Sequence, residues 1–263
     1  MSRTGYPDTD PATKALTIRS DIPIIPRTKL IVINEIWRKT IMKMSSKSRL
    51  TEKQLSVFPG GSLFEKIARA VCNAGTLPVK ELYEAWEVAR RVRRKYRGGR
   101  VVDLACGHGL LAHIMLLLDD SSPEAVAVDS SVPKNAFLLS ESITEAWPRL
   151  RGRIHYIKAR IQEIEIFPED LVVSVHACGG LTDTVLETAC NAGARVAVVP
   201  CCHDLEVCDT GGLEGWIDGP LAVDVTRAAR LRAHGYTVTT RRIPGDITPK
   251  NRLLMGHRDH ARP

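Results

Sequence analysis

The stretch Arg100-Val-Val-Asp-Leu-Ala-Cys-Gly-His-Gly-Leu-Leu-Ala-His113 decides the fold that the sequence predicts. It begins with a short apolar run that ends in Asp103, passes through Gly107 and Gly109, and continues with apolar residues at helical spacing. This order predicts a strand, a glycine turn and a helix. In such a unit the glycines let the backbone approach a ligand, and the N-terminus of the helix faces that ligand.

A second acid follows at the spacing expected for a nucleoside site. The segment Glu124-Ala-Val-Ala-Val-Asp129 predicts another strand, and its last residue lies 22 positions after Gly107. A carboxylate at this place can accept hydrogen bonds from both ribose hydroxyls of a bound nucleoside. The sequence therefore predicts a cofactor that contains a nucleoside.

Two classes of cofactor fit this unit. Gly107, Gly109 and Ala112 match a weak dinucleotide fingerprint. The string Asp103-Leu-Ala-Cys-Gly-His-Gly109 also resembles motif I of class I S-adenosylmethionine-dependent methyltransferases. A carboxylate at Asp103 favours the second class, because it suits a ligand with an amino group and a sulfonium and suits a pyrophosphate poorly. A phosphate-free βα turn in some other α/β protein is the remaining alternative.

Composition agrees with one large domain, with or without a small N-terminal appendage. The chain has 263 residues and 44% hydrophobic residues, and no apolar run approaches the ~20 residues needed to span a bilayer. The first residues lack the apolar segment of a signal peptide and carry early acids, so we expect a cytoplasmic protein and no membrane partner. Seven cysteines, an odd number, indicate reduced thiols.

Charge is distributed unevenly along the chain. Residues 1–100 hold 21 Lys and Arg against 9 Asp and Glu, whereas the rest holds 16 against 21. This asymmetry indicates that the first half handles an anionic partner. A solubilising face is the alternative.

The pattern predicts three regions: a basic, partly disordered extension over residues 1–58, a helical cap over 59–99, and a methyltransferase domain over 100–263. Residues 30–33 fit a strand or the start of a helix. In the cap, Ser62 and Glu65 have capping-box spacing, and a second helix begins near Val79. The cap either covers the cofactor with Lys80, Tyr83 or Glu84, or presents a solvated face. The polar face of the second helix is expected to carry the following cations: Arg90, Arg91, Arg93, Arg94 and Lys95.

From residue 100 onward, strand and helix patterns alternate, which predicts a mainly parallel sheet covered on both faces. Further strands are expected at residues 154–158, 170–176, 195–199, 236–243 and 252–257, and helices at 133–147, near 185–190 and at 220–234. The fold class is therefore α/β, a Rossmann-like sheet of seven strands, with a basic helical extension before it.

Two strand ends carry motifs of a particular methyltransferase branch. His176-Ala-Cys-Gly-Gly-Leu-Thr-Asp183 and Pro200-Cys-Cys-His203 resemble the methyltransferase domain of glutathione S-transferase C-terminal domain-containing proteins and the acceptor-stem tRNA 2′-O-methyltransferases. The resemblance spans roughly residues 75–256. It implies S-adenosyl-L-methionine as cofactor, held by Asp103, Ala105, Cys106, Gly107, His108, Gly109, Asp129, Ser130, Arg160, Ile161 and His176.

Methyl transfer to a hydroxyl needs in-line positioning and removal of a proton. His176 and His203 are the candidate bases, because histidine titrates near pH ~6.5. His176 is alternatively a cofactor contact or a buried hydrogen-bonding group. Asp183 either orients one histidine or caps a helix.

A zinc site from Cys178, Cys201, Cys202 and His203 is conceivable, but adjacent cysteines alternate across a strand and no CxxC spacing is present, so no metal is expected. The cysteines are otherwise packing residues, or one of them is a nucleophile.

The basic first hundred residues and the resemblance together imply an S-adenosylmethionine-dependent methyltransferase that modifies RNA, with tRNA foremost. Its competitors are a small-molecule or protein methyltransferase, and a silent module that binds a nucleoside without catalysis.

Overall fold

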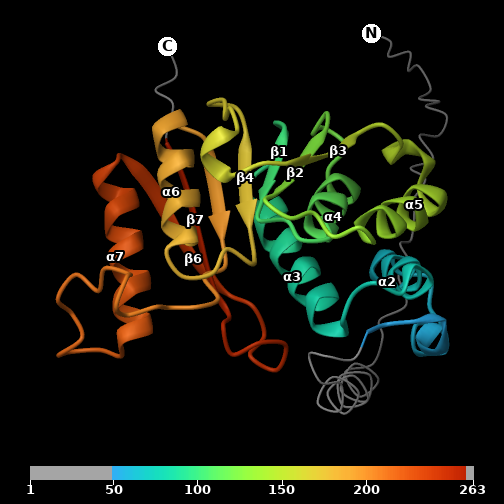
Figure 1. Ribbon diagram of the computed structural model, residues 1–263, viewed down its shortest axis with the longest axis horizontal. Coiled ribbons are helices and arrows are strands. Elements are labelled where there is room, and N and C mark those ends of the chain that lie inside the picture. The colour runs from blue at the N-terminus through green and yellow to red at the C-terminus, as the bar shows by residue number, and fades with distance from the viewer. Residues whose placement is uncertain (1–48, 259–263) are drawn as a thin grey trace, which may run out of the picture. The chain divides into compact units, whose positions relative to one another are not determined.

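The computed structural model describes residues 49–258, and the predictions for residues 30–33 and for most of the basic extension lie outside them. Its elements follow one another along the chain as drawn in Figure 1. Their bounds are η1 Glu52–Val57, α2 Leu63–Ala74, α3 Val79–Lys95, β1 Val101–Leu104, α4 Leu110–Leu118, β2 Ala125–Asp129, α5 Ala136–Ala146, η2 Pro148–Leu150, β3 Ile154–Lys158, η3 Ile161–Glu163, β4 Leu171–Ser174, α6 Leu181–Ala192, β5 Arg195–Val198, α7 Gly219–Ala233, β6 Tyr236–Arg242 and β7 Arg252–Arg258.

The seven strands form one sheet in the order β3-β2-β1-β4-β5-β7-β6. The first five strands pair in parallel, and β7 pairs antiparallel with both β5 and β6. The predicted α/β sheet is confirmed. The strand order reverses between the neighbouring strands β1 and β4. An open α/β sheet binds its ligand at such a point, outside the carboxyl ends of the strands.

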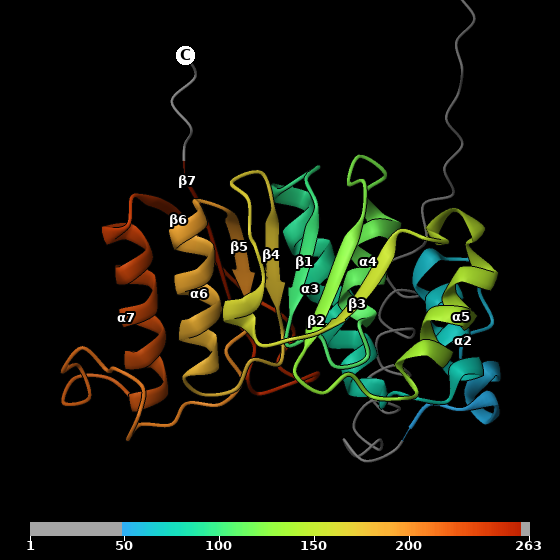
Figure 2. The ribbon, with the colours of Figure 1, turned by 45° about the horizontal axis from the view of Figure 1, so that its top comes forward.

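Helices cover both faces of the sheet. Figure 2 shows α6 and α7 on one face and α3 and α4 on the other. The central strands are buried on both sides, so β1 and β4 consist of fully buried residues. One core cluster packs Val102 and Val172 of the strands against Val185 and Ala189 of α6.

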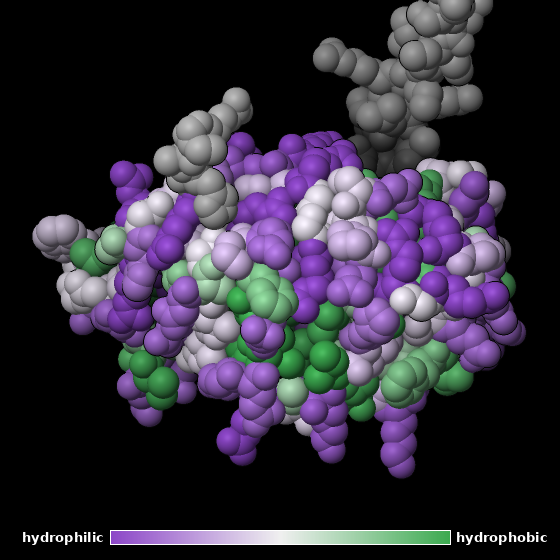
Figure 3. Space-filling view, turned by 90° about the horizontal axis from the view of Figure 1, so that it is seen from above, coloured by the Kyte–Doolittle hydropathy of each residue, from purple (hydrophilic) through white to green (hydrophobic). Residues whose placement is uncertain are grey.

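The outer surface seen in Figure 3 is mainly hydrophilic, with smaller apolar areas between. Within residues 49–258, no helix has the length and apolar character that crossing a membrane requires.

The helical cap is built as its sequence predicts. The Ser62 hydroxyl accepts from the Glu65 amide at 3.2 Å, and the Glu65 carboxylate accepts from the Ser62 amide and hydroxyl, which completes the capping box of α2. Residues 49–58, which precede the predicted cap, also pack against it. Leu50 and Phe58 are buried, and the Leu50 amide donates to the Leu77 carbonyl at 2.8 Å. Residues on both sides of the predicted boundary at residue 58 are therefore in contact, and the division into three regions stays a prediction.

Arg93, which was expected on the polar face of α3, is instead buried. Arg93 is 2% exposed, and its guanidinium lies 3.0 Å from the Asp119 carboxylate and donates to the Met115 carbonyl. The pairing compensates the buried charge. Glu87 and Arg91, four residues apart on the same helix, form an ion pair.

Candidate active site

Two strand ends, helix α3 and the start of α4 enclose a cavity at the carboxyl edge of the sheet. The turn after β1 supplies one wall, the end of β4 supplies Val175 and His176, and α3 supplies Glu81 and Ala85. Of the predicted cofactor residues, the following line this cavity together: Asp103, Ala105, Cys106, His108 and His176. The turn after β1 and the end of β4 thus share one cavity, although Gly107 and Gly109 themselves are not among its lining residues.

The turn after β1 requires its glycines. Gly107 and Gly109 have φ of 53° and 72°, in the left-handed region that favours glycine. A Cβ at Gly109 would lie 2.8 Å from the hydroxyl of Tyr156, which itself donates to the His108 carbonyl at 2.8 Å. A Cβ at Gly107 would meet nothing within 4 Å. The backbone at Gly107 is therefore open to a ligand, whereas Gly109 is needed for packing.

Ala105 has φ of 57°, the one positive φ among the described non-glycine residues. Strained backbone of this kind is concentrated at binding and catalytic sites.

Asp129 connects the end of β2 to this turn. Its Oδ2 accepts from the Gly107 amide at 3.0 Å, and its Oδ1 accepts from the Ser131 amide at 2.9 Å. A carboxylate has about four lone-pair positions, so this arrangement leaves acceptors for the two hydroxyls of a ribose. The half-buried position of Asp129 and the exposed position of Ser130 agree with a role at the edge of a nucleoside site.

Asp103 brings a buried carboxyl group to the same cavity. It is 2% exposed, and its Oδ2 accepts from the Ala112 amide at 3.2 Å. Burial raises its pKa to about 8, and the Asp129 charge adds to the effect. A cationic ligand group beside it would favour the ionised form. The donor set therefore fits a cofactor that carries an ammonium and a sulfonium at one end and a ribose at the other.

Two further residues that the resemblance implies for the cofactor, Arg160 and Ile161, follow the end of β3. Arg160 is exposed and begins η3, where its amide donates to the Glu163 carboxylate at 2.9 Å. The side chain of Ile161 packs into the core beside the sheet, so only its backbone remains to face a ligand.

The cap helix α3 reaches the cavity through residues other than those predicted. Lys80 pairs with the buried Glu84 at 3.4 Å, and the Tyr83 ring stacks against Phe64 at 4.9 Å between centroids. Glu81 and Ala85, one turn apart, line the cavity instead. The sequence left two possibilities for the cap: that it covers the cofactor or that it presents a solvated face. Helix α3 does line the cavity, but through Glu81 and Ala85 and not through Lys80, Tyr83 or Glu84.

The two candidate histidines lie in different surroundings. His176 is exposed and lines the cavity beside Asp103 and Cys106. His203 has a side chain that is 1% exposed, and its Nε2 lies 2.8 Å from Asp224 Oδ1. Within residues 49–258, the buried Nδ1 of His203 has no hydrogen-bond partner. His203 is thus closed off from a substrate in this conformation, and His176 is accessible.

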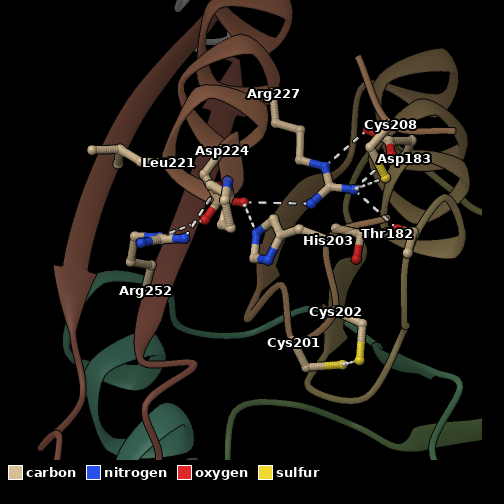
Figure 4. A network of polar contacts seen from close by, with 12 residues as sticks. Thr182, Asp183, Cys201, Cys202, His203, Cys208, Leu221, Asp224, Arg227 and Arg252 are labelled. Atoms are coloured by element: carbon tan, nitrogen blue, oxygen red, sulfur yellow. Dashed lines mark hydrogen bonds and ion pairs between the residues drawn. The ribbon is translucent and has the colours of Figure 1, made fainter. Parts of the chain in front are cut away.

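Asp224 is the functional residue that the sequence analysis missed. It lies on α7 and holds three groups: His203 after β5, Arg227 on its own helix, and Arg252 at the start of β7 at 2.5 Å (Figure 4). Burial alone would raise the pKa of Asp224, but the hydrogen bonds from His203 and Arg252 outweigh burial and hold it below its usual range. Asp224 lies 21 positions after His203 and 28 positions before Arg252, so no local sequence pattern could reveal these contacts.

Asp183 does neither of the things predicted for it. The N-cap of α6 is Gly180, and the Asp183 carboxylate accepts from Arg227 at 2.6 and 2.9 Å. The histidine is oriented by Asp224 because α7 places that acid, and not Asp183, next to the imidazole. Asp183 instead compensates the buried guanidinium of Arg227.

Comparison with known proteins agrees with this geometry. Residues 78–207 match a family model described as a methyltransferase domain. This segment is a methyltransferase domain. With the turn after β1, the acid at the end of β2 and the buried Asp103, the chain is a methyltransferase whose cofactor is S-adenosylmethionine.

Solved methyltransferase structures resemble the chain at low identity. An O-methyltransferase family protein from Burkholderia thailandensis is 18% identical, with a TM-score of 0.47 over 89% of this chain and 71% of that one. An S-adenosylmethionine-dependent O-methyltransferase from Thermotoga maritima is 14% identical, with a TM-score of 0.47 over 77% and 73%. A precorrin-6y C5,15-methyltransferase from Geobacter metallireducens is 11% identical, with a TM-score of 0.43 over 68% and 88%. No curated protein sequence matches the chain.

Proposed function

We propose that the protein transfers a methyl group from S-adenosylmethionine to RNA, with tRNA as the first class of acceptor to test. The observation that carries the proposal is the concentration of positive charge before the cofactor domain, where residues 1–100 have 21 Lys and Arg against 9 Asp and Glu. Such an excess attracts a phosphate backbone. The sequence resemblance to acceptor-stem tRNA methyltransferases supports tRNA over other RNA.

Cations at the edge of the sheet add local support. The strand β6 ends in Arg241 and Arg242, both exposed, and β7 begins with Arg252. These three arginines line a cavity of 390 Å³ between the last two strands, α7 and Pro200. Because β6 runs parallel to β5, its end lies at the same edge as the cofactor turn. An anionic acceptor that approaches this edge would be attracted to the cavity.

The bound cofactor supplies an electrophilic methyl group on its sulfonium. The chain holds it through the Gly107 backbone, Asp129 and Asp103. For a hydroxyl acceptor we assign the proton acceptor to His176, and its exposure and its position in the cavity lining support this role. His203 acts as a positioning residue: through Asp224 it ties the segment after β5 to α7.

The substrate class is tested by the salt dependence of binding. The full chain and an Arg241→Gln/Arg242→Gln variant are titrated with tRNA at several salt concentrations, with a polyanion of another class, heparin, as competitor. We expect affinity to fall steeply with salt, and the variant to show a shallower slope, reduced by about one unit for each lost phosphate contact. Binding to tRNA that is weak or independent of salt would contradict an RNA acceptor.

A further inference from the structure

Three cysteines meet at the ends of two neighbouring strands. Cys178 follows β4, and Cys201 and Cys202 follow β5. Their sulfur atoms all lie within 4.8 Å of one another, with 2.9 Å between Cys178 and Cys201 and 3.8 Å between Cys201 and Cys202. The two segments are joined by their backbones as well, since the Gly179 amide donates to the Cys202 carbonyl at 3.0 Å.

This spacing fits a single metal ion. Thiolates bind zinc at about 2.3 Å in a tetrahedral arrangement, which places the sulfur atoms about 3.8 Å apart. The distance from Cys201 to Cys202 has this value. The sulfur atoms of Cys178 and Cys201 are 2.9 Å apart and would have to separate to about 3.8 Å when both bind one ion. The sequence argument against adjacent ligands does not apply, because β5 ends at Val198 and both cysteines lie in the irregular segment beyond it.

The neighbouring histidine is not part of the cluster. Figure 4 shows the His203 ring directed toward Asp224, apart from the sulfur atoms of Cys201 and Cys202. Cys178 and Cys202 are exposed and Cys201 is half-buried, so the open side of the cluster faces water.

We propose that Cys178, Cys201 and Cys202 bind one zinc ion through three thiolates, with the fourth position open to water. Soft thiolate ligands select zinc over hard cations such as magnesium or calcium. The ion joins the segments that follow β4 and β5. Because Cys178 lies two residues after His176, the ion also fixes the segment that carries His176 against the cofactor cavity. The site is independent of what the enzyme methylates.

The test uses the full chain, reduced and stripped of metal with a chelator, then titrated anaerobically with Co²⁺ and Zn²⁺. We expect one ion per chain, a near-ultraviolet charge-transfer band from sulfur to cobalt, and displacement of cobalt by zinc. Cys202 is exposed, so the Cys202→Ser variant should fold normally. We expect its metal affinity to fall by about 100-fold or more, because each thiolate supplies roughly a third of the protein's bonds to the ion. Circular dichroism of the metal-free variants confirms that they are folded.

Two controls separate this site from the other thiols. Cys72→Ala removes a buried cysteine of α2, and Cys190→Ala removes a buried cysteine of α6; both should bind cobalt as the unaltered chain does. Reduced, folded protein that shows no charge-transfer band would overturn the proposal. So would equal affinity in Cys202→Ser and the unaltered chain.

Discussion

The Nε2 atom of His203 lies 2.8 Å from Oδ1 of Asp224, and this contact ties the segment after β5 to helix α7. Asp224 also holds Arg252 at the start of β7, so one buried carboxylate fixes three parts of the carboxyl edge. The carboxylate orients the imidazole and keeps its proton on Nε2, as a carboxylate partner does in other histidine pairs.

Replacing Asp224 by Asn should therefore impair turnover more than cofactor binding. The residue does not line the cofactor cavity, whereas its partners position the segment that carries Cys201 and Cys202. We expect kcat to fall about tenfold or more with a nearly unchanged Kd for S-adenosylhomocysteine, because misplaced groups cost rate without touching the cofactor. Single-turnover kinetics and calorimetry measure the two quantities. Asp209→Asn, an exposed acid paired with Arg230, is the control, and a parallel loss of cofactor binding in Asp224→Asn would contradict the account.

Asp129→Asn should weaken cofactor binding. The carboxylate accepts from the Gly107 and Ser131 amides and is expected to accept from the ribose. Hydrogen bonds to a charged group are worth about 1.5–3 kcal/mol, so we expect Kd to rise about 10- to 100-fold in calorimetry. Asp120→Asn provides a matched control, because Asp120 is an acid at 78% side-chain exposure far from the turn in sequence. An unchanged Kd for Asp129→Asn would remove this residue from the site.

Asp119→Ala should strongly destabilise the fold. It leaves the guanidinium of Arg93, 2% exposed, without its charge partner at 3.0 Å. Breaking a buried pair in this way costs about 3–5 kcal/mol. Urea unfolding measures the loss, with the exposed neighbour Asp120→Ala expected to change stability by less than about 1 kcal/mol. Similar stability of the two variants would show that the buried pair contributes little.

His113 gives a prediction on pH. It is fully buried in α4, its Nδ1 donates to the Gly109 carbonyl at 2.8 Å, and burial lowers its pKa to about 4. The unfolded chain therefore binds more protons between pH 6.5 and 4, so the stability from neutral His113 is lost as pH falls through this window, by up to about 3 kcal/mol. The raised pKa of Asp103 acts in the opposite direction over an overlapping range, which makes comparison with a variant necessary.

The variant His113→Gln keeps hydrogen-bonding groups and does not titrate. Its urea midpoint should fall less than that of the unaltered chain between pH 7 and 4.5. Parallel losses in the two proteins would show that His113 does not titrate in this window.

Much of the fold follows from local pattern, because the strand–glycine–helix unit and the buried apolar strands are encoded by consecutive residues. The turn at Gly107 and Gly109 and the acid at Asp129 were predictable for the same reason. The burial of Arg93 was not, because an arginine near a helix C-terminus is usually exposed and only the distant Asp119 explains it. The pairing of His203 with Asp224 depends on how α7 packs, which no spacing in the sequence expresses.

The cysteine cluster shows a similar limit. Cys201 and Cys202 were read as strand residues that alternate across the sheet. The strand stops at Val198, and the irregular backbone beyond it allows both sulfur atoms to face Cys178.

The most direct test of the proposed function is transfer of label from methyl-labelled S-adenosylmethionine to total cellular RNA. Purified full chain is incubated with both, with and without RNase, beside His176→Gln. The account predicts label in RNA that disappears with RNase, and a rate reduced by about 100-fold or more in His176→Gln, the usual loss when a general base is removed. Cofactor that binds normally while RNA stays unlabelled would contradict the RNA acceptor, and label that is unaffected by His176→Gln would contradict the base.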